Sequence, residues 1–218
     1  MLGSGRSRVS LLAIGTAVLC LAGQAVAVGP VVADAPGPRV GAPVLLAYEN
    51  FEDELAGLVF PHDPWTVWDI NMATGGDVKW DDDDFKPHQG SYSAWPANGG
   101  SDSVDPGPYV DYPPNTDTWM TCGPIDLSGY GAALFDFWYW NRSEVGYDFF
   151  SWGASSDMLP SFVWMEEVDG DSGGWVHAVA DLNAFVGDAS VWIGFRFRSD
   201  DYGEDVGAFV DDVSIWGL

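Results

Sequence analysis

Basic residues are scarce in this sequence, and their scarcity argues against a whole class of partners. Lysine and arginine number 8 against 33 aspartates and glutamates, which gives a formal net charge of −25. Because phosphate backbones and anionic membrane surfaces are bound through basic faces, neither nucleic acid nor a membrane surface is an expected partner. The excess of carboxylates instead suits solubility and the binding of cations.

Cysteines and long apolar runs are also nearly absent. Residues 1–27 resemble a secretory signal, with two arginines near the start, an apolar middle at 10–21 and a small-x-small triplet at 25–27. The apolar middle is too short to span a membrane. Removal of residues 1–27 takes away two of the 8 basic residues and no acid, so the formal net charge changes from −25 to −27. Cys122 then remains as the only cysteine, and we expect a secreted, extracellular protein without an intrachain disulfide.

Long helical periodicity is the third absence, and it favours a β fold. Glycine (27) and proline (14) are frequent, and the chain of 218 residues is long enough for one core. We predict an all-β, antiparallel two-sheet jelly-roll β-sandwich of about ten strands over 45–218, after a flexible lead-in at 28–44. The strands are predicted at 45–51, 90–95, 119–122, 132–140, 149–155, 162–168, 175–181, 191–198 and from 209 onward, with short apolar pieces at 65–70 and 78–80. Residues 81–84, four aspartates, are expected to form a solvated loop, and 96–117 a long loop.

The C-terminal run from Val191 to Trp216 carries the densest set of oxygen ligands. A period of two would put Asp211 on the same face as Phe209 and Val213, and a carboxylate directed toward a core must be paired or bind a metal. Since the first and last strands of a jelly roll commonly lie side by side, acids of both could hold a calcium ion. The candidate calcium ligands are Glu49, Glu52, Asp53, Asp200, Asp211 and Asp212. The alternative is that Asp211 caps a buried backbone group or pairs with an arginine.

Two predicted strands also place tryptophan beside charge on their non-core faces. Aromatic rings stack on sugar rings, and arginine or aspartate can hydrogen-bond sugar hydroxyls, so this pattern is compatible with a glycan-binding surface. The candidate residues are Asp136, Trp138 and Trp140 on 132–140, and Trp192, Arg196 and Arg198 on 191–198. The alternative is that both faces are covered, with Arg196 paired to an acid such as Asp136.

A family resemblance rests on the order of several short motifs. They are GSYSAW at 90–95, IDLSGY at 125–130, LFDFWY at 134–139, GGW at 173–175, DLNAFVG at 181–187, IGFRF at 193–197 and GAFVDDV at 207–213. Together they resemble a MAM-type jelly-roll module over about 48–216, similar to the β-sandwich domains of immune inhibitor A-like secreted metallopeptidases. The resemblance implies a concanavalin-like or galactose-binding-like sandwich with calcium near the paired termini, used for adhesion or substrate engagement. The sequence has no His-Glu-x-x-His, so the zinc protease domain of those enzymes is missing from it.

Catalytic readings of the sequence are weaker, and no catalytic residue is assigned. The stretch at 170–174, GDSGG, is similar to the surroundings of a protease nucleophile, but no histidine has the matching context, and an ordinary hairpin loop explains it. Glu166 and Glu167, as neighbours on a strand, point to opposite faces and cannot serve one glycosidic bond. Residues 141–143, NRS, fit a glycosylation acceptor.

The sequence therefore predicts a secreted, calcium-stabilised recognition or adhesion module for glycan or extracellular protein. The competing class is a divergent glycosidase or a peptidase-associated domain on the same sandwich. A structural component of a surface or matrix would be distinguished by self-association.

Overall fold

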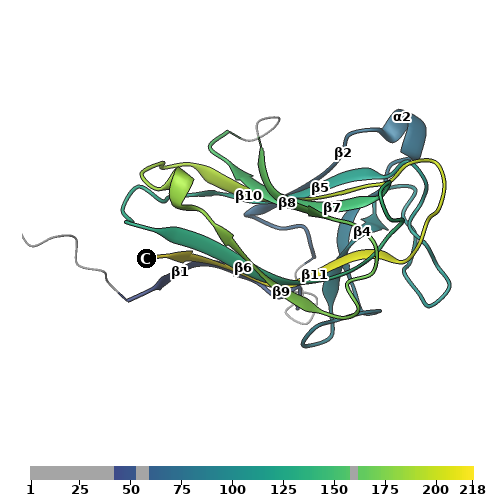
Figure 1. The fold of residues 1–218 in the computed structure, drawn as a ribbon, viewed down its shortest axis with the longest axis horizontal. Helices are drawn as coiled ribbons and strands as arrows, with labels where there is room; N and C mark the ends of the chain where they lie inside the picture. The colour runs from purple at the N-terminus through teal and green to yellow at the C-terminus, as the bar shows by residue number, and fades with distance from the viewer. Residues whose placement is uncertain (1–41, 53–58, 158–161) are drawn as a thin grey trace, which may run out of the picture. The chain divides into compact units, whose positions relative to one another are not determined.

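The computed structural model describes residues 42–52, 59–157 and 162–218 and is all-β there (Figure 1). Eleven strands form two antiparallel sheets, and helix is limited to a single turn, α2 (Met72–Gly75), and a 3-10 turn, η1 (Asn183–Phe185). The predicted fold class is confirmed. The signal-like segment 1–27 and the lead-in up to residue 41 lie outside the described residues. Within the described ranges, no helix is long and apolar enough to cross a membrane.

The first sheet has the order β3-β4-β11-β6-β9, with β1 also paired to β11. Its strands are β1 (Val44–Glu49), β3 (Lys79–Asp83), β4 (Ser93–Gly99), β6 (Ala133–Arg142), β9 (Val176–Asp181) and β11 (Gly207–Gly217). Tyr48 lies opposite Ser214 and Glu49 opposite Val213. The expected side-by-side placement of the first and last strands is therefore confirmed.

The second sheet has the order β2-β5-β10-β7-β8. Its strands are β2 (Trp65–Asp69), β5 (Asp117–Ile125), β7 (Phe149–Ser155), β8 (Val163–Val168) and β10 (Val191–Arg198). The alternation on β10 is regular, because Phe195 and Phe197 are fully buried while Arg196 and Arg198 are partly exposed. Every second side chain of this strand faces the first sheet, and the others form an outer face.

Aromatic side chains fill the space between the sheets. Phe137 of β6 is fully buried, and its ring centroid lies 4.8 Å from that of Phe195 on β10 and 5.2 Å from that of Trp152 on β7. Fully burying one such side chain contributes about 1.5–3 kcal/mol. This core fixes which side chains of each strand remain on the outer faces, where a binding site must lie.

Two details of the predicted strands were wrong. Residues Asp82 and Asp83 do not lie in a solvated loop; they belong to β3 and are buried. On β11 a bulge at Asp212, whose φ is +50°, breaks the period of two. Asp211 lies opposite Trp138, on the outer face, whereas Val213 faces the core beyond the bulge. The fully buried Asp211 is therefore covered from outside the sandwich.

Candidate functional site

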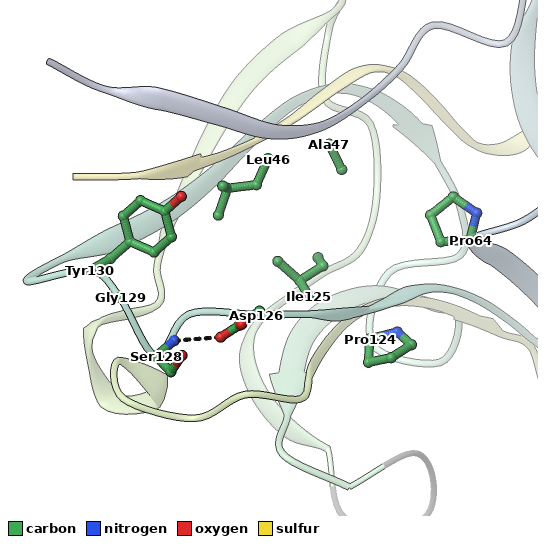
Figure 2. Close-up of a pocket in the computed structure, with 9 residues that line it drawn as sticks. All are labelled: Leu46, Ala47, Pro64, Pro124, Ile125, Asp126, Ser128, Gly129 and Tyr130. Atoms are coloured by element: carbon green, nitrogen blue, oxygen red, sulfur yellow. Dashed lines mark hydrogen bonds between the residues drawn. The ribbon is translucent and has the colours of Figure 1, made fainter.

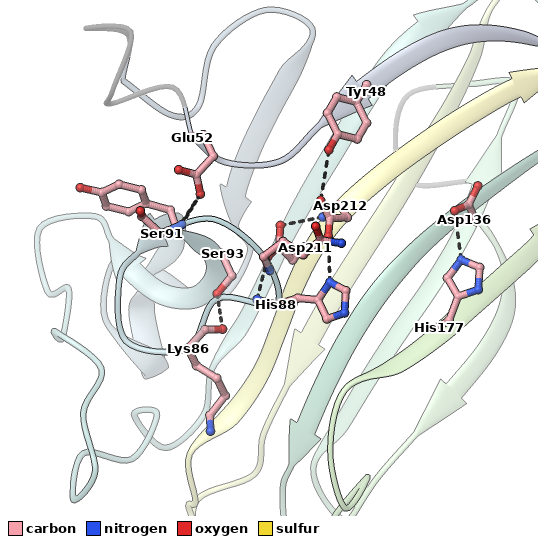
Figure 3. Close-up of polar contacts among 12 residues, drawn as sticks. Tyr48, Glu52, Lys86, His88, Ser91, Ser93, Asp136, His177, Asp211 and Asp212 are labelled. Atoms are coloured by element: carbon pink, nitrogen blue, oxygen red, sulfur yellow. Dashed lines mark hydrogen bonds and ion pairs between the residues drawn. The ribbon is translucent and has the colours of Figure 1, made fainter.

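The cover over Asp211 is the connection between β3 and β4. The backbone N–H groups of His88 and Gln89 donate to Asp211 Oδ2 at 2.8 and 3.1 Å, and the N–H of Asp212 donates to Oδ1 at 2.7 Å (Figure 3). Burial raises the pKa of Asp211 to about 6; the adjacent Asp212 adds to the rise, and the N–H donors oppose it. Asp211 thus anchors this connection to the sheet. This agrees with the alternative interpretation of the sequence, in which Asp211 caps buried backbone groups.

Asp212 lies next to Asp211 and contacts two different elements. Its Oδ1 accepts the Tyr48 hydroxyl of β1 at 3.1 Å, and its Oδ2 lies 2.8 Å from His88 Nδ1. Ligand atoms of His88, Asp211 and Asp212 all lie within 4.8 Å of one another. Among the described residues, no lysine or arginine pairs with either aspartate. Two adjacent carboxylates with little cationic compensation provide the kind of oxygen donors that a hard cation binds.

The other predicted calcium ligands are distributed differently. Glu52 Oε1 accepts the N–H groups of Ser91 and Tyr92 at 2.6 and 2.9 Å, so it holds the same β3–β4 connection as Asp211. Glu49 Oε1 accepts the N–H of Phe51, and its Oε2 lies 3.5 Å from His62. Asp53 lies outside the described residues.

Asp200 belongs to a second group of acids, formed by the β6–β7 and β10–β11 connections. Its neighbours there are Glu144 and Asp148, whose ligand atoms also lie within 4.8 Å of it. Asp148 is fully buried and accepts hydrogen bonds from the Tyr112 hydroxyl and, at 2.8 Å, from the N–H of Asp200. The structure therefore separates Asp200 from the Asp211–Asp212 pair.

The outer face of the first sheet carries three of the predicted glycan contacts, and two of its tryptophans are covered. The indole of Trp138 stacks on His88 at 4.0 Å and on His177 at 5.0 Å between ring centroids. Because these two histidines approach from opposite sides of β6, they cover both faces of the indole. Asp136 hydrogen-bonds His177 Nε2 at 3.0 Å and accepts Trp216 Nε1 at 2.9 Å.

Trp140 is covered in a similar way. The Lys86 ammonium lies 4.0 Å from its ring centroid, and Phe209 lies 5.9 Å from it in an edge contact. Trp138 is thus stacked on two histidines, and one face of the Trp140 ring lies under the Lys86 ammonium. Lys86 and the two histidines form a cationic or polar layer over this aromatic row.

The outer face of the second sheet is different, because rows of large side chains alternate with rows of small ones across its strands. Arg196 lies opposite Trp119, which lies opposite Trp68. The next row has only small side chains, and we call it the low row: Gly194 lies opposite Thr121, and Thr121 lies opposite Thr66. Residues opposite one another in an antiparallel pair share a face. Phe162 covers the Gly194 end of the low row, whereas Thr66 at the other end is exposed.

Trp192 borders the low row on its other side. A methyl group on Gly123 would lie 2.7 Å from Trp192 Cδ1, so the indole rests against this glycine, whose φ is +149°. Trp192 is four residues from Arg196, which is about 13 Å along a strand. Trp68 and Trp192 are both partly exposed. The low row thus lies between tryptophan side chains on both sides.

The arginines of this face are held in place by acids. Arg196 Nε and an Nη donate to the two oxygens of Asp117 at 2.7 and 2.6 Å, and its guanidinium lies 5.2 Å from the Trp119 ring. Arg198 donates to Glu167 Oε1 at 2.9 Å. The acid paired with Arg196 is therefore Asp117, on the neighbouring strand, and not Asp136, which lies in the other sheet.

A hollow of about 580 Å³ opens between the two sheets below β1 (Figure 2). It is lined mainly by apolar groups, with Leu46, Ile125 and Tyr130 among them. Among the described residues that line it, the one carboxylate is that of Asp126, which accepts the N–H of Ser128 at 2.9 Å. The described residues that line this hollow therefore do not supply the pair of acids that glycoside hydrolysis requires.

The motifs considered above for catalysis and for glycosylation have structural roles. Ser172 accepts the N–H of Asn141 at 3.1 Å and donates to the carbonyl of Gly174 at 2.7 Å. Glu167 accepts the Ser151 hydroxyl as well as Arg198. Asn141 is 1% exposed and donates its amide to the carbonyl of Gly170. The amide of Asn141 is thus inaccessible to glycosylation in the folded protein.

Comparison with solved structures finds two adhesin domains of the same type of fold and, at lower similarity, a carbohydrate-binding module. The K3 cleaved adhesin domain of Lys-gingipain from Porphyromonas gingivalis W83 aligns with a TM-score of 0.56 and 17% identity, covering 80% of this chain and 98% of that domain. The K1 domain of the same protein gives 0.52 and 16%, covering 82% and 99%. The carbohydrate-binding module TmCBM61, solved with β-1,4-galactotriose, gives 0.48 and 15%, covering 78% and 99%. No family model and no curated protein matches the chain. At these identities the likeness concerns the fold alone.

Proposed function

We propose that this chain is an extracellular, calcium-stabilised adhesin-type module that binds glycan on the outer face of its second sheet. The observation that carries the proposal is the exposed Thr66 end of the low row, which is bordered by the partly exposed indoles of Trp68 and Trp192, whereas Thr121 in the middle of the row is buried. A sugar ring seated there would contact aromatic surface on either side and the Thr66 hydroxyl below. The adhesin fold, the MAM-like motif order and the signal-like N-terminus support the same role.

The face is rigid in the parts that would orient a ligand. The Arg196 guanidinium is fixed by a bidentate contact with Asp117 and by its contact with Trp119. Little side-chain entropy therefore remains to be lost on binding. Arg196 belongs to the row next to the low row, and both Arg196 and Asp117 remain partly exposed. Polar groups at the rim would provide specificity, and the tryptophans would provide most of the contact area.

The test is a polysaccharide array probed with the full chain, followed by titration of the strongest ligand. Trp68→Ala and Trp192→Ala should each weaken binding by about tenfold, the loss expected for one aromatic stacking contact. Trp138→Ala is the matched control, because its ring is already covered, and it should bind within about twofold of the unmodified chain. Equal losses in all three variants, or a loss only in Trp138→Ala, would reject this face as the glycan site.

The calcium part of the proposal concerns Asp211, Asp212 and Glu52. These carboxylates converge on the β3–β4 connection, and Asp211 and Asp212 have no lysine or arginine partner in the described ranges. A calcium ion there would neutralise Asp211 and the partly exposed Asp212 and would hold the connection in place. At a concentration one hundred times its dissociation constant, it would add about 2.7 kcal/mol to the free energy of unfolding.

This part is tested by the melting temperature of the full chain in excess chelator and in millimolar calcium. The unmodified chain should melt at a higher temperature with calcium, and Asp211→Asn should lose that rise. Asp200→Asn, in the second acidic group, should keep it. If Asp211→Asn shows the full calcium-dependent rise, the ion does not bind at this pair.

A further inference from the structure

The connections at one end of the sandwich hold an unusual share of the exposed large apolar side chains. Four segments meet there, at 70–78, 100–116, 143–148 and 199–206, near α2 in Figure 1. The segments adjoin strand ends that pair with one another. Asp117 lies opposite Arg198, and Arg142 lies opposite Gly207. Six of the twelve exposed large hydrophobic residues of the described ranges lie in these segments: Ile70, Met72, Tyr109, Val145, Tyr147 and Tyr202.

Contacts between the connections make this end one surface. The N–H of Asn115 donates to the carbonyl of Asp200 at 2.6 Å, and that of Tyr112 to the carbonyl of Asp205 at 3.0 Å. The carboxylate of Glu144 lies against Gly203, which has a φ of +87°. Tyr147 and Tyr202 therefore project from two connections that touch each other, with side chains exposed to 61% and 80%. Exposed aromatic groups gathered on loops are typical of protein-binding surfaces.

The charge of this surface determines what kind of partner suits it. The four segments contain no lysine, arginine or histidine and ten acids: Asp77, Asp102, Asp105, Asp111, Glu144, Asp148, Asp200, Asp201, Glu204 and Asp205. Of these ten acids, only Asp77 and Asp205 pair with a basic side chain of the described residues, Lys79 and Arg142 respectively. Desolvation raises the pKa of Glu144, and repulsion from the neighbouring Asp200, Asp148 and Glu204 adds to the rise.

We propose that this loop end, with Tyr147 and Tyr202 at its centre, docks a polypeptide segment rich in arginine and lysine. Guanidinium groups would stack on the exposed tyrosine rings and pair with the surrounding carboxylates, and the aliphatic stems would cover Val145. A metal ion would satisfy the carboxylates but would make no use of the aromatic and aliphatic side chains. Tyr147 and Tyr202 lie on the β6–β7 and β10–β11 connections and not on the strands that carry the tryptophan rows, so docking here does not depend on glycan binding.

The test is fluorescence anisotropy of the full chain with a labelled nonapeptide of alternating arginine and alanine, at physiological salt. The same peptide with glutamate in place of arginine is the charge control. Tyr147→Ser combined with Tyr202→Ser should weaken binding of the arginine peptide by about fivefold to tenfold. Val163→Ser combined with Val179→Ser removes two side chains of 58% and 60% exposure elsewhere and should leave binding unchanged.

A second pair of variants separates docking from general attraction to an acidic protein. Asp201→Asn with Glu204→Gln should weaken binding strongly, whereas Asp126→Asn with Asp188→Asn, the same change in net charge outside this end, should have little effect. Equal losses in the two charge variants, no loss in the tyrosine variant, or no binding of the arginine peptide would each overturn the proposal. The melting temperature of each variant shows that the fold is retained.

Discussion

Replacing Arg196 with methionine removes a two-pronged ion pair while keeping a long side chain beside Trp119. The donor–acceptor distances to Asp117 are 2.7 and 2.6 Å, and the two side chains are 22% and 19% exposed. Exposed pairs contribute about 0.2–1 kcal/mol, and breaking a fully buried pair costs about 3–5 kcal/mol. The intermediate exposure gives an expected loss of about 2 kcal/mol, or about 4–8 °C in melting temperature for a domain of this size.

The assay is urea unfolding of the single variants Arg196→Met and Asp117→Asn and of the double variant. We expect a coupling energy of about 1–2 kcal/mol, since each single variant leaves a partner uncompensated. The pair between Arg198 and Glu167, with exposures of 40% and 39%, is the matched control and should couple by less than about 1 kcal/mol. Additive effects at Arg196 and Asp117 would refute the argument, because they would mean that solvent already screens the pair.

Two other predictions concern stability. Burial raises the pKa of Asp83 to about 6, with Asp105 and Asp84 adding to the rise, so the fold favours its protonated form. This group should therefore increase the free energy of unfolding by about 1–3 kcal/mol as the pH falls from above 6 toward 4, and Asp83→Asn should flatten that dependence in urea titrations; an unchanged slope would contradict it. Phe137→Ala should cost about 3–5 kcal/mol in the same assay, whereas Tyr202→Ala should stay within about 0.5 kcal/mol; a Phe137 cost near that of Tyr202 would contradict the assigned core.

Most of the strands follow from local alternation, and the exceptions have local causes. The predicted bounds 149–155 and 191–198 agree with β7 and β10, because regular inward and outward side chains mark both strands. The aspartates of β3 have no apolar alternation, so the pattern favoured a loop there. The bulge at Asp212 depends on a single residue with positive φ, and a regular period of two does not predict such a residue.

The sites could be predicted only in part, because their partners are distant in the chain. Asp211 and Asp212 could be singled out from their place in the last strand, but His88 is separated from them by more than 120 positions and no spacing links them. The tryptophans of β6 and β10 could be assigned to non-core faces. Which sheet each strand joins, and therefore which ring is covered, depends on strand order rather than on the local pattern.

The pairing of β1 with β11 has a consequence for how this domain can be connected. Val44 lies opposite Gly217, so the incoming and outgoing chain are neighbours across one strand pair, about 5 Å apart. A domain with this geometry can be inserted into a surface loop of another protein without separating the ends of that loop. For the same reason, a short turn joining residue 217 to residue 44 should permit circular permutation, with new ends opened in an exposed connection.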